Sequence, residues 1–364
     1  MTTIRERPVS NPSTFPKEPP NMGNLALTSL LATFLAAAPP AEPKLRRFEY
    51  SRVEMAVEIS IVLYADDEAK AAEAAEAAFD RIRQLNDILS DYHADSELRQ
   101  LCTTAGEGRA VPVSREFWTV LSRAREISDQ SGGAFDVTVG QMSRLWRRAR
   151  VQRQLPSEQR LATARELTDY RLVRMDAEKR SVELLKTGMR LDLGGIAKGY
   201  ATDEALAVLR KAGISRALVD AGGDIALGDP PPDKPGWRIG IARLEADGPP
   251  SRIATLSGVA MATSGDTWQY VEIDGTRYSH LVDPRTGLGI TDHSNVTVIA
   301  PDGITADALA SAVSVLGPKR GLELIDRTPG TAALILRAPE GKLETYRSAR
   351  WSQLPIHHEK EAKP

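Results

Sequence analysis

The sequence predicts an α+β fold of mixed, largely antiparallel sheets with packed helices. Strand-like segments outnumber helical ones along the 364 residues. Many of these strands are joined by short turns, such as Asp274-Gly275, which suits the type I′ turn of a β-hairpin. Strands and helices do not alternate regularly, so a Rossmann fold is disfavoured.

The first elements follow from their hydrophobic periodicity. Residues 55–64 (MAVEISIVLY) alternate and predict a strand. A helix is predicted at 68–90, because four apolar residues fall on one face: Phe79, Ile82, Leu85 and Leu89. A second amphipathic helix is predicted at 115–130, with its inward face formed by Phe117, Leu121, Ala124 and Ile127.

The remainder of the body is rich in strands. The highly charged segment Arg144–Arg174 is expected to be a helical excursion at the surface, and further helices are predicted at 197–211 and 305–316. The proline-rich runs at 230–235 and 248–250 are loops. The remaining strands are predicted at 181–185, 190–193, 216–219, 224–227, 237–242, 252–256, 259–262, 269–273, 277–282, 294–299 and 331–337.

Composition excludes several classes of function. The chain has 47 basic and 49 acidic residues and a formal net charge of −2, which argues against nucleic acid as the main partner. Aromatic residues make up 5% of the chain, too few for a platform that stacks single-stranded bases. The one cysteine, Cys102, excludes an internal disulfide and a thiolate metal cluster. With five histidines, two of them in the C-terminal tail, a zinc site of several histidines is disfavoured.

The terminal segments are expected to differ from the body, which spans 46–345. Residues 1–45 are predicted to be disordered or signal-like, because the apolar run Asn24–Ala38 is too short to span a bilayer comfortably and ends in small residues. We expect export, with a periplasmic or inner-membrane-associated location and possible membrane association through this segment. A buried or interfacial helix in a cytoplasmic protein is the alternative. Residues 346–364 form a polar C-terminal tail.

The segment RLDLGGIAKGYATDEA, 190–205, is the first candidate site. Gly194 and Gly195 permit a close approach that side chains would block. The helix that follows begins with unpaired N–H groups that attract anions, and Lys198 adds a positive charge at the same end. Asp192 could accept a hydrogen bond from a ligand. Tight packing of a strand-to-helix turn explains the same glycines equally well.

This loop is not a nucleoside-triphosphate P-loop. Gly194 and Gly199 have the outer spacing of that motif, but Tyr200 stands where it requires lysine.

Three further stretches are polar and marked by glycine. In VDAGGDIALGD, 219–229, Asp224 follows two glycines, which could equally form a bulge between strands. In the hairpin exit at 270–287, His280 is followed by a turn containing Asp283, Arg285 and Thr286, although a lone histidine is often structural.

The last stretch is the helix TADALASAVSVLG, 305–317. Asp307 and Ser311 are four residues apart and therefore share a face near its start. A carboxylate, a hydroxyl and backbone carbonyls are hard oxygen ligands that suit Mg²⁺ rather than zinc. An acidic first helical turn without a metal is the alternative.

Taken in order, these stretches closely resemble the FAD:protein FMN transferases, the ApbE-like flavin transferases. The resemblance extends from about residue 50 to 340 and implies their ApbE-like, T-fold-like architecture. The matching segments are SDYHADSEL at 90–98, GGAFDVTVGQMSRLW at 132–146, DLGGIAKGYATD at 192–203, VDAGGDI at 219–225, SGD at 264–266, HLVDPRTG at 280–287 and ADALASAVSVLG at 306–317.

The resemblance implies an activity and a set of roles. The family moves FMN from FAD onto a Thr or Ser hydroxyl of a partner protein, with Mg²⁺ and release of AMP. The implied acceptor is a flavoprotein subunit of a redox pump or an electron-transfer complex. His280 would be the general base. Implied FAD contacts are Met55, Tyr92, Ala134, Phe135, Asp136, Asp192, Lys198, His280 and Leu281. Implied metal ligands are the carbonyls of Gly195 and Ala310 and the side chains of Asp307 and Ser311.

Two positions depart from the family pattern, and two other functions remain open. Ala56 stands where the family commonly has glycine, and Ser311 replaces the common threonine while keeping its hydroxyl. A Mg²⁺-dependent FAD pyrophosphatase would use water in place of the protein hydroxyl. A flavin-binding protein without turnover would need neither the metal nor the base.

Overall fold

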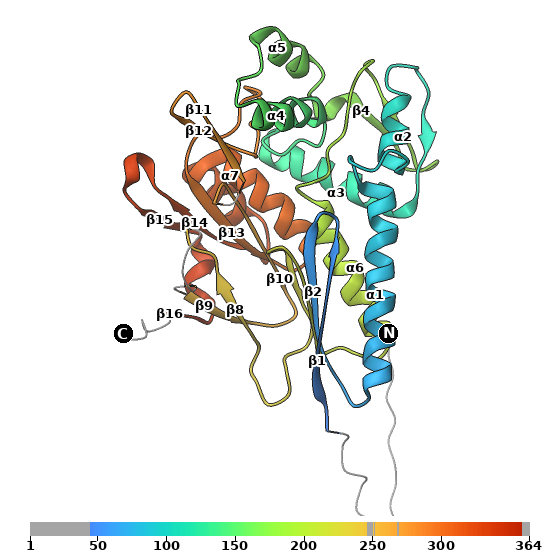
Figure 1. Cartoon of the computed structure of the whole chain (residues 1–364), viewed down its shortest axis with the longest axis vertical. Coiled ribbons are helices and arrows are strands. Elements are labelled where there is room, and N and C mark those ends of the chain that lie inside the picture. Colours follow the sequence, from blue (N-terminus) through green and yellow to red (C-terminus); the bar gives the residue numbers. More distant parts are fainter. Residues whose placement is uncertain (1–43, 246–249, 251, 268, 359–364) are drawn as a thin grey trace, which may run out of the picture. The chain divides into compact units, whose positions relative to one another are not determined.

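The computed structural model describes residues 44–358, apart from 246–249, 251 and 268. The described residues belong to one compact unit, Pro43–Pro364, and the predicted α+β class with largely antiparallel sheets is confirmed. Its centre is an eight-stranded sheet in which every paired neighbour is antiparallel (Figure 1). In spatial order its strands are β1 (Arg46–Glu54), β2 (Val57–Ala65), β6 (Ala217–Ala221), β7 (Ile225–Leu227), β10 (Ala260–Gly265), β13 (Ser294–Ala300), β14 (Ala332–Arg337) and β15 (Glu344–Arg347).

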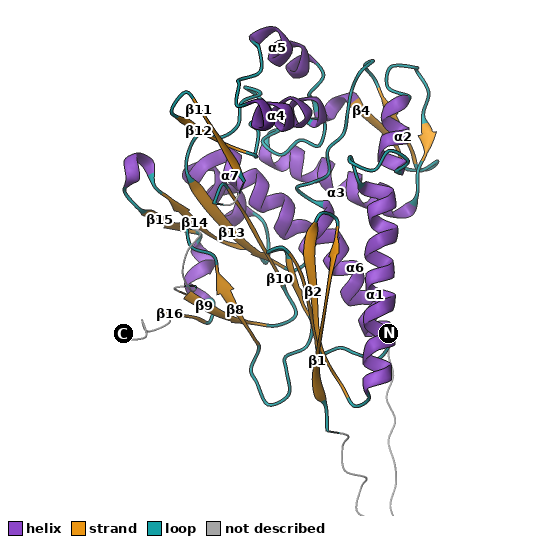
Figure 2. Cartoon of the chain, viewed as in Figure 1, coloured by secondary structure: helices purple, strands orange, loops and turns teal. Residues whose placement is uncertain are grey.

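One face of this sheet is covered by helices. Alternate strand residues, such as Ile59 and Ile61 of β2 and Val298 of β13, point into a core that the helices complete. Figure 2 shows these helices in purple beside the orange strands. They are α1 (Glu68–Leu89), α3 (Arg115–Ser131), α6 (Ala197–Lys211) and α7 (Gly303–Arg327).

The other face carries a second core beneath a small sheet. Val62, Leu334 and Leu336 of the large sheet pack there against Trp237 and Trp351. The small sheet consists of β8 (Trp237–Ile241), β9 (Arg252–Leu256) and β16 (Ile356–His358). Because both faces are covered, every residue of the central strand β13 is buried, including the polar Asn295 and Thr297.

Smaller elements lie near one end of the large sheet. The hairpin β11 (Tyr270–Ile273) and β12 (Thr276–Ser279) turns at Asp274-Gly275, where both residues have positive φ, as a type I′ turn requires. Other elements there are α2 (Glu97–Thr103), α4 (Gly140–Gln152), α5 (Glu158–Glu166), β3 (Val111–Pro112), β4 (Val173–Asp176), β5 (Ser181–Leu184) and the short 3₁₀ helix Tyr170–Leu172.

The strand predicted at 55–64 begins two residues later, because Met55 and Ala56 form the turn of the β1–β2 hairpin. Both have positive φ, 50° and 63°. A positive φ favours glycine, which explains why the family commonly has glycine at the position that Ala56 occupies here.

Four other boundaries differ from the sequence predictions. The strand predicted at 190–193 is wrong: Arg190 makes only an isolated bridge to Val139. The single excursion at 144–174 is two helices followed by the start of β4. The strand predicted to reach residue 282 ends at Ser279, so His280 lies in a loop. The last helix continues beyond residue 316 to Arg327, with non-helical backbone at Gly317.

The chain remains structured beyond residue 345. A 3₁₀ helix at Ala349–Gln353 carries the buried Trp351, and β16 pairs with β9, so most of the polar tail packs on the body. The signal-like segment 1–45 lies outside the described residues up to position 43. Within the described ranges, no helix has the length and hydropathy needed to cross a bilayer.

Candidate active site

The candidate site lies where α6 and α7 begin and cross. A Cβ atom at Gly199 would overlap the Gly303 carbonyl oxygen and would lie 2.8 Å from Cβ of Asp307. The glycine therefore lets the two helices touch through their backbones. This contact brings the 192–203 and 306–317 segments together, although more than 100 residues separate them.

A buried charge cluster forms at the crossing. Nζ of Lys198 lies 2.5 Å from Oδ2 of Asp224 and 3.8 Å from Oδ2 of Asp307. Burial acts to lower the pKa of Lys198, but the two carboxylates outweigh it and raise the value well above its ordinary range. Lys198 is therefore charged, and its ammonium group is ion-paired with two carboxylates.

Asp307 is the second carboxylate of this cluster, and the single ammonium of Lys198 does not balance both carboxylates. Its Oδ2 accepts a hydrogen bond from the Gly199 amide at 3.1 Å, and the residue is 4% exposed. Burial and the charge of Asp224 raise the pKa of Asp307 to about 7, against the opposing effect of Lys198. Two carboxylates around one ammonium leave room for a further positive charge.

The residues proposed to hold Mg²⁺ fit such a cation. A Cβ atom at Gly195 would lie 2.8 Å from Oγ of Ser311, so the glycine loop directly faces that hydroxyl. Ser311 makes no side-chain hydrogen bond with any other described residue. The Ala310 carbonyl lies within α7 and accepts a bond from Oγ of Ser314. The described residues contain no group of three or more His, Cys, Asp or Glu side chains that could hold a metal. The donor set proposed here differs from such a group, because it combines one carboxylate with neutral oxygens.

The carboxylate of Asp192 is held between the loop and α4. Its Oδ1 accepts a bond from the Gly194 amide at 2.8 Å, and Oδ2 lies 3.2 Å from a guanidinium nitrogen of Arg147. The same guanidinium lies 2.5 Å from Oδ2 of Asp91 and 4.0 Å from the ring centroid of Tyr92. The exposed Tyr92 ring thus rests on Arg147 beside the glycine loop.

The Ala134–Asp136 run reaches the loop through its aromatic ring. Cε2 of Phe135 would lie 3.4 Å from a Cβ atom at Gly195. Asp136 has a structural role as well: its carboxylate accepts bonds from Thr138 and from the Tyr170 amide. Ala134 is buried, and no polar side-chain contact connects Met55 or Leu281 with the other described site residues.

His280 has a defined orientation. Its backbone N–H donates to the Gln269 carbonyl at 3.0 Å, and Nδ1 lies 3.1 Å from the same oxygen. Because a carbonyl only accepts, Nδ1 carries the proton in this contact and Nε2 keeps its lone pair. Burial lowers the pKa of His280, the Gln269 contact opposes this, and the charges of Arg150 and Lys198 lower it further.

The hairpin that precedes His280 is anchored by the SGD segment. Asp266, 2% exposed, accepts bonds from Nε of Arg277 at 2.6 Å, from His293 at 2.8 Å and from the Ser294 amide at 3.0 Å. The Arg277 guanidinium also stacks on the ring of Tyr270. Both strands of the hairpin are therefore tied to the large sheet.

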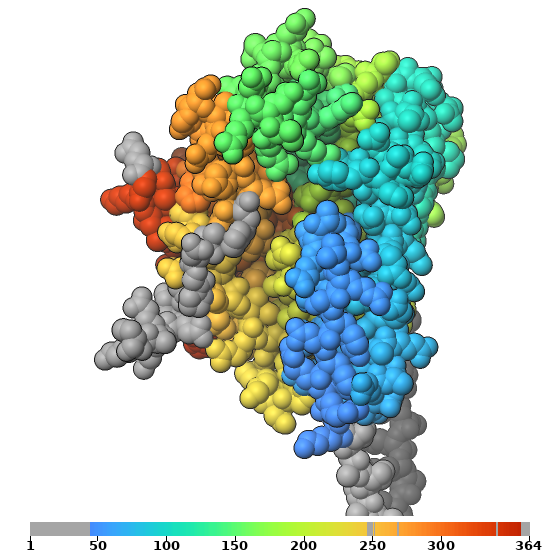
Figure 3. All heavy atoms as spheres, viewed as in Figure 1, coloured from blue at the N-terminus to red at the C-terminus, as the bar shows by residue number. Residues whose placement is uncertain are grey.

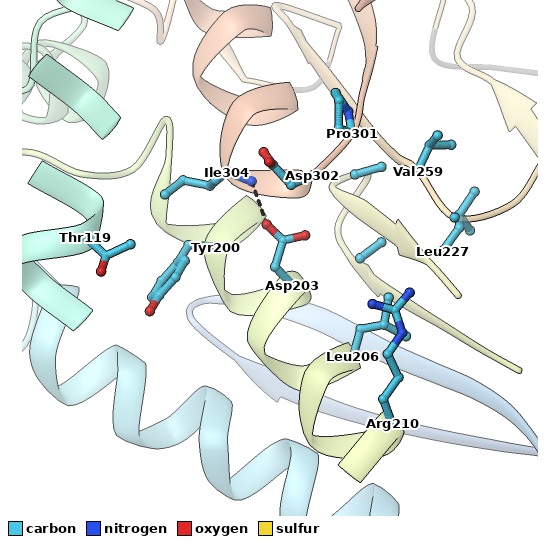
Figure 4. A pocket seen from close by; sticks show the side chains of 13 residues that line it. Thr119, Tyr200, Asp203, Leu206, Arg210, Leu227, Val259, Pro301, Asp302 and Ile304 are labelled. Carbon is cyan, nitrogen blue, oxygen red and sulfur yellow. Dashed lines mark hydrogen bonds between the residues drawn. The ribbon is translucent and has the colours of Figure 1, made fainter. Parts of the chain in front are cut away.

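A cavity of about 330 Å³ lies on another side of the same crossing (Figure 4). Asp203 points into it and accepts bonds from the amides of Gly303 and Ile304, which begin α7. Burial raises the pKa of Asp203 to about 7. Among the described residues, none of the predicted site residues lines this cavity, so it is separate from the candidate site.

Sequence reasoning missed three residues of this arrangement. Asp224 was singled out after its two glycines but without a role, and the structure pairs it with Lys198. Arg147 and Asp91 were not identified, because they come from a charged helix and from a loop 100 residues before Asp192. Their pairing with Asp192 is a tertiary contact that spacing does not show.

Comparison with known proteins agrees with this geometry. The ApbE family model matches residues 55–335. A protein of Treponema pallidum named FAD:protein FMN transferase is 33% identical over 79% of this chain and 84% of its own length. A Haemophilus influenzae protein of the same name is 31% identical over 74% and 80%.

Solved structures agree as well. The flavin transferase ApbE of Vibrio cholerae superposes with a TM-score of 0.77 at 27% identity, over 85% of this chain and 100% of that one. The flavinyl transferase ApbE of Pseudomonas stutzeri gives 0.76 at 28% identity, over 85% and 97%. Because the family model covers most of the chain and the fold agrees with these structures, this chain belongs to the ApbE family.

Proposed function

We propose that this chain is an FAD:protein FMN transferase that uses Mg²⁺ and a Thr or Ser acceptor on a flavoprotein subunit of a redox pump or electron-transfer complex, with release of AMP. Family membership and the names of the relatives support the transferase activity itself. One observation supports the finer chemistry most. Nδ1 of His280 is held on the Gln269 carbonyl, so the ring presents Nε2 with its lone pair available to accept a proton.

The reaction exchanges the phosphoanhydride linkage of FAD for a phosphoester linkage to the acceptor. The acceptor hydroxyl attacks the phosphorus of the FMN half of FAD, the bond between that phosphorus and the bridging oxygen breaks, and AMP leaves with that oxygen. Nε2 of His280 takes the hydroxyl proton. When Mg²⁺ is bound by Asp307, Ser311 and the Gly195 and Ala310 carbonyls, it supplies charge neutralisation at the phosphate oxygens.

The remaining site residues bind and orient. The Tyr92 ring, supported by Arg147, offers a flat surface for an aromatic ring of the substrate. Asp192 is fixed by Gly194 and Arg147 and can accept from a polar N–H or O–H group of FAD. Lys198 holds Asp224 and Asp307 together and so shapes the metal pocket.

The activity is tested by incubating the chain with FAD, Mg²⁺ and the flavin-carrying subunit of a redox-driven ion pump. We expect covalent flavin fluorescence on the acceptor and an equal amount of AMP. His280→Ala should lower the transfer rate by about 100-fold or more, since general base catalysis contributes on that order. His357→Ala, an exposed histidine on β16, is the matched control.

The same assay separates the alternatives. AMP without a labelled acceptor would indicate a pyrophosphatase, and FAD binding without AMP would indicate a flavin-binding protein. Because its pKa is lowered from about 6.5, His280 should be deprotonated at neutral pH. At saturating Mg²⁺, whose binding keeps Asp307 ionised, the transfer rate should then fall only as pH drops below about 6.5. A midpoint above pH 7 would contradict the assignment of His280 as the base.

Export is the proposed location, carried by the apolar run at 24–38, which precedes the described residues. Sequencing the amino terminus of the mature protein decides this proposal, since cleavage near Ala38 is expected and an intact terminus would contradict it.

A further inference from the structure

Helix α4 is attached to the hairpin that leads to His280. Trp146 and Ala149 pack against Val271 and Ile273 of the hairpin. Nε1 of Trp146 donates to the Gly287 carbonyl at 2.8 Å, beyond His280 in the chain. Figure 3 shows the green atoms of this helical region in contact with the orange atoms of the hairpin. The helix therefore packs directly against the segments on both sides of His280 in the chain.

Arg147 and Arg150 each follow one of the two packed residues. They are three positions apart and share the adjacent face of α4. Arg147 shows where this face points, because it reaches Asp192, Asp91 and the Tyr92 ring. Arg150 lies one turn further along the same side of α4 and next to Ala149, which packs on the hairpin that leads to His280.

The surroundings of Arg150 place it within the candidate site. It is half-buried and makes no hydrogen bond or ion pair with any other described residue. Its charge adds to burial in lowering the pKa of His280. It also opposes the rise that burial causes in the pKa of Tyr92. The charge of Arg150 thus acts on both the proposed flavin surface at Tyr92 and the proposed base His280.

The charges around this space show which cation is available to a ligand. Lys198 is held by Asp224 and Asp307, and Arg147 is held by Asp91 and Asp192. Arg150 has no carboxylate partner in the described part of the chain. The pyrophosphate of FAD carries two negative charges, and a guanidinium binds phosphate oxygens with two parallel donors.

We propose that Arg150 binds a pyrophosphate oxygen of FAD and holds the phosphate linkage in front of His280. This assignment rests on the proposed function, since it takes FAD as the substrate. It adds a cation on α4 to the FAD contact that the resemblance implies for Lys198.

The test compares Arg150→Met with the wild-type chain in binding to two flavins, FAD and riboflavin, which lacks phosphate. Loss of one charge-assisted hydrogen-bonding group should weaken FAD binding roughly 10- to 100-fold. Riboflavin affinity should change by less than about twofold, because no phosphate is involved. Arg150→Lys should restore part of the FAD affinity. Both variants are measured alongside their thermal unfolding curves.

Arg148→Met is the matched control, because Arg148 lies on the same helix, is exposed and bonds only to Gln152 among the described residues. It should bind both flavins as the wild type does. The proposal is overturned if Arg150→Met binds FAD normally or loses both flavins equally. A wild-type chain that binds riboflavin as tightly as FAD would also overturn it. A chain that binds no FAD would instead remove the proposed function, and this assignment with it.

Discussion

Ser311 is a hydroxyl without a hydrogen-bond partner in the described structure, and it directly faces the glycine loop. A methyl group at Gly195 would lie 2.8 Å from its Oγ. Asp307 lies one helical turn earlier on the same face of α7. A hydroxyl that is left unpaired beside a carboxylate and a loop carbonyl is well placed to bind a hard cation.

Ser311→Ala should raise the Mg²⁺ concentration needed for half-maximal transfer by at least about tenfold, since losing even an outer-shell partner weakens a metal site by about 10- to 100-fold. Ser311→Thr should restore the wild-type value, because threonine keeps the hydroxyl. The measurement is a Mg²⁺ titration of the transfer rate at saturating FAD. Identical titrations of wild type and Ser311→Ala would remove Ser311 from the metal site.

At the scale of the elements, the crossing of α6 and α7 decides where the site forms. Helix propensity alone favours alanine over glycine at position 199 by about 1 kcal/mol. The contact with Gly303 opposes this preference, because an added methyl group would meet a backbone carbonyl that cannot rotate away. The glycine is therefore required by the close approach of the two helices.

Gly199→Ala should lower the free energy of unfolding by about 1–3 kcal/mol, the cost of overpacking a close contact. It should also lower the transfer rate, since Asp307 accepts its hydrogen bond from the Gly199 amide. Ala207→Gly, a half-buried position on the same helix, is the control and should cost only about 1 kcal/mol. Chemical denaturation measures both, and a stabilised Gly199→Ala variant would contradict the contact argument.

At the scale of the molecule, the large sheet has a core on each face. The helical face carries the candidate site, and the opposite face is covered by β8, β9 and the C-terminal segment. Trp351 is 3% exposed in the second core, so the segment after residue 345 contributes to the stability of the body.

Trp351→Ala should cost about 3–5 kcal/mol of unfolding free energy, the range for removing a buried tryptophan. Ser352→Ala, an exposed neighbour, should change it by less than about 0.5 kcal/mol. Thermal or denaturant unfolding distinguishes them. Equal stability of the two variants would mean that the C-terminal segment does not hold the second core.

The hydrophobic pattern of the sequence predicted most helices and strands. It failed where apolar alternation and hydrogen-bonded strand pairing do not coincide. Strand β1 was missed because its residues are charged or polar in most positions and exposed as an edge strand, so no apolar alternation marks it. The segment 190–193 alternates because Leu191 and Leu193 are buried, yet Arg190 makes only one bridge there. Alternation reports burial, whereas a strand also needs a partner.

The fold class, the family and the residue types of the candidate site can be predicted from the sequence, because ordered blocks of glycine, aspartate, serine and histidine are local features. Which charges meet depends on how the helices pack. The tertiary structure paired Lys198 with Asp224 and Asp307, placed Arg147 between Asp91 and Asp192, and left Arg150 without a partner among the described residues. Ion pairing depends on distances of a few ångströms between residues far apart in the chain, and these exist only once α4, α6 and α7 are packed.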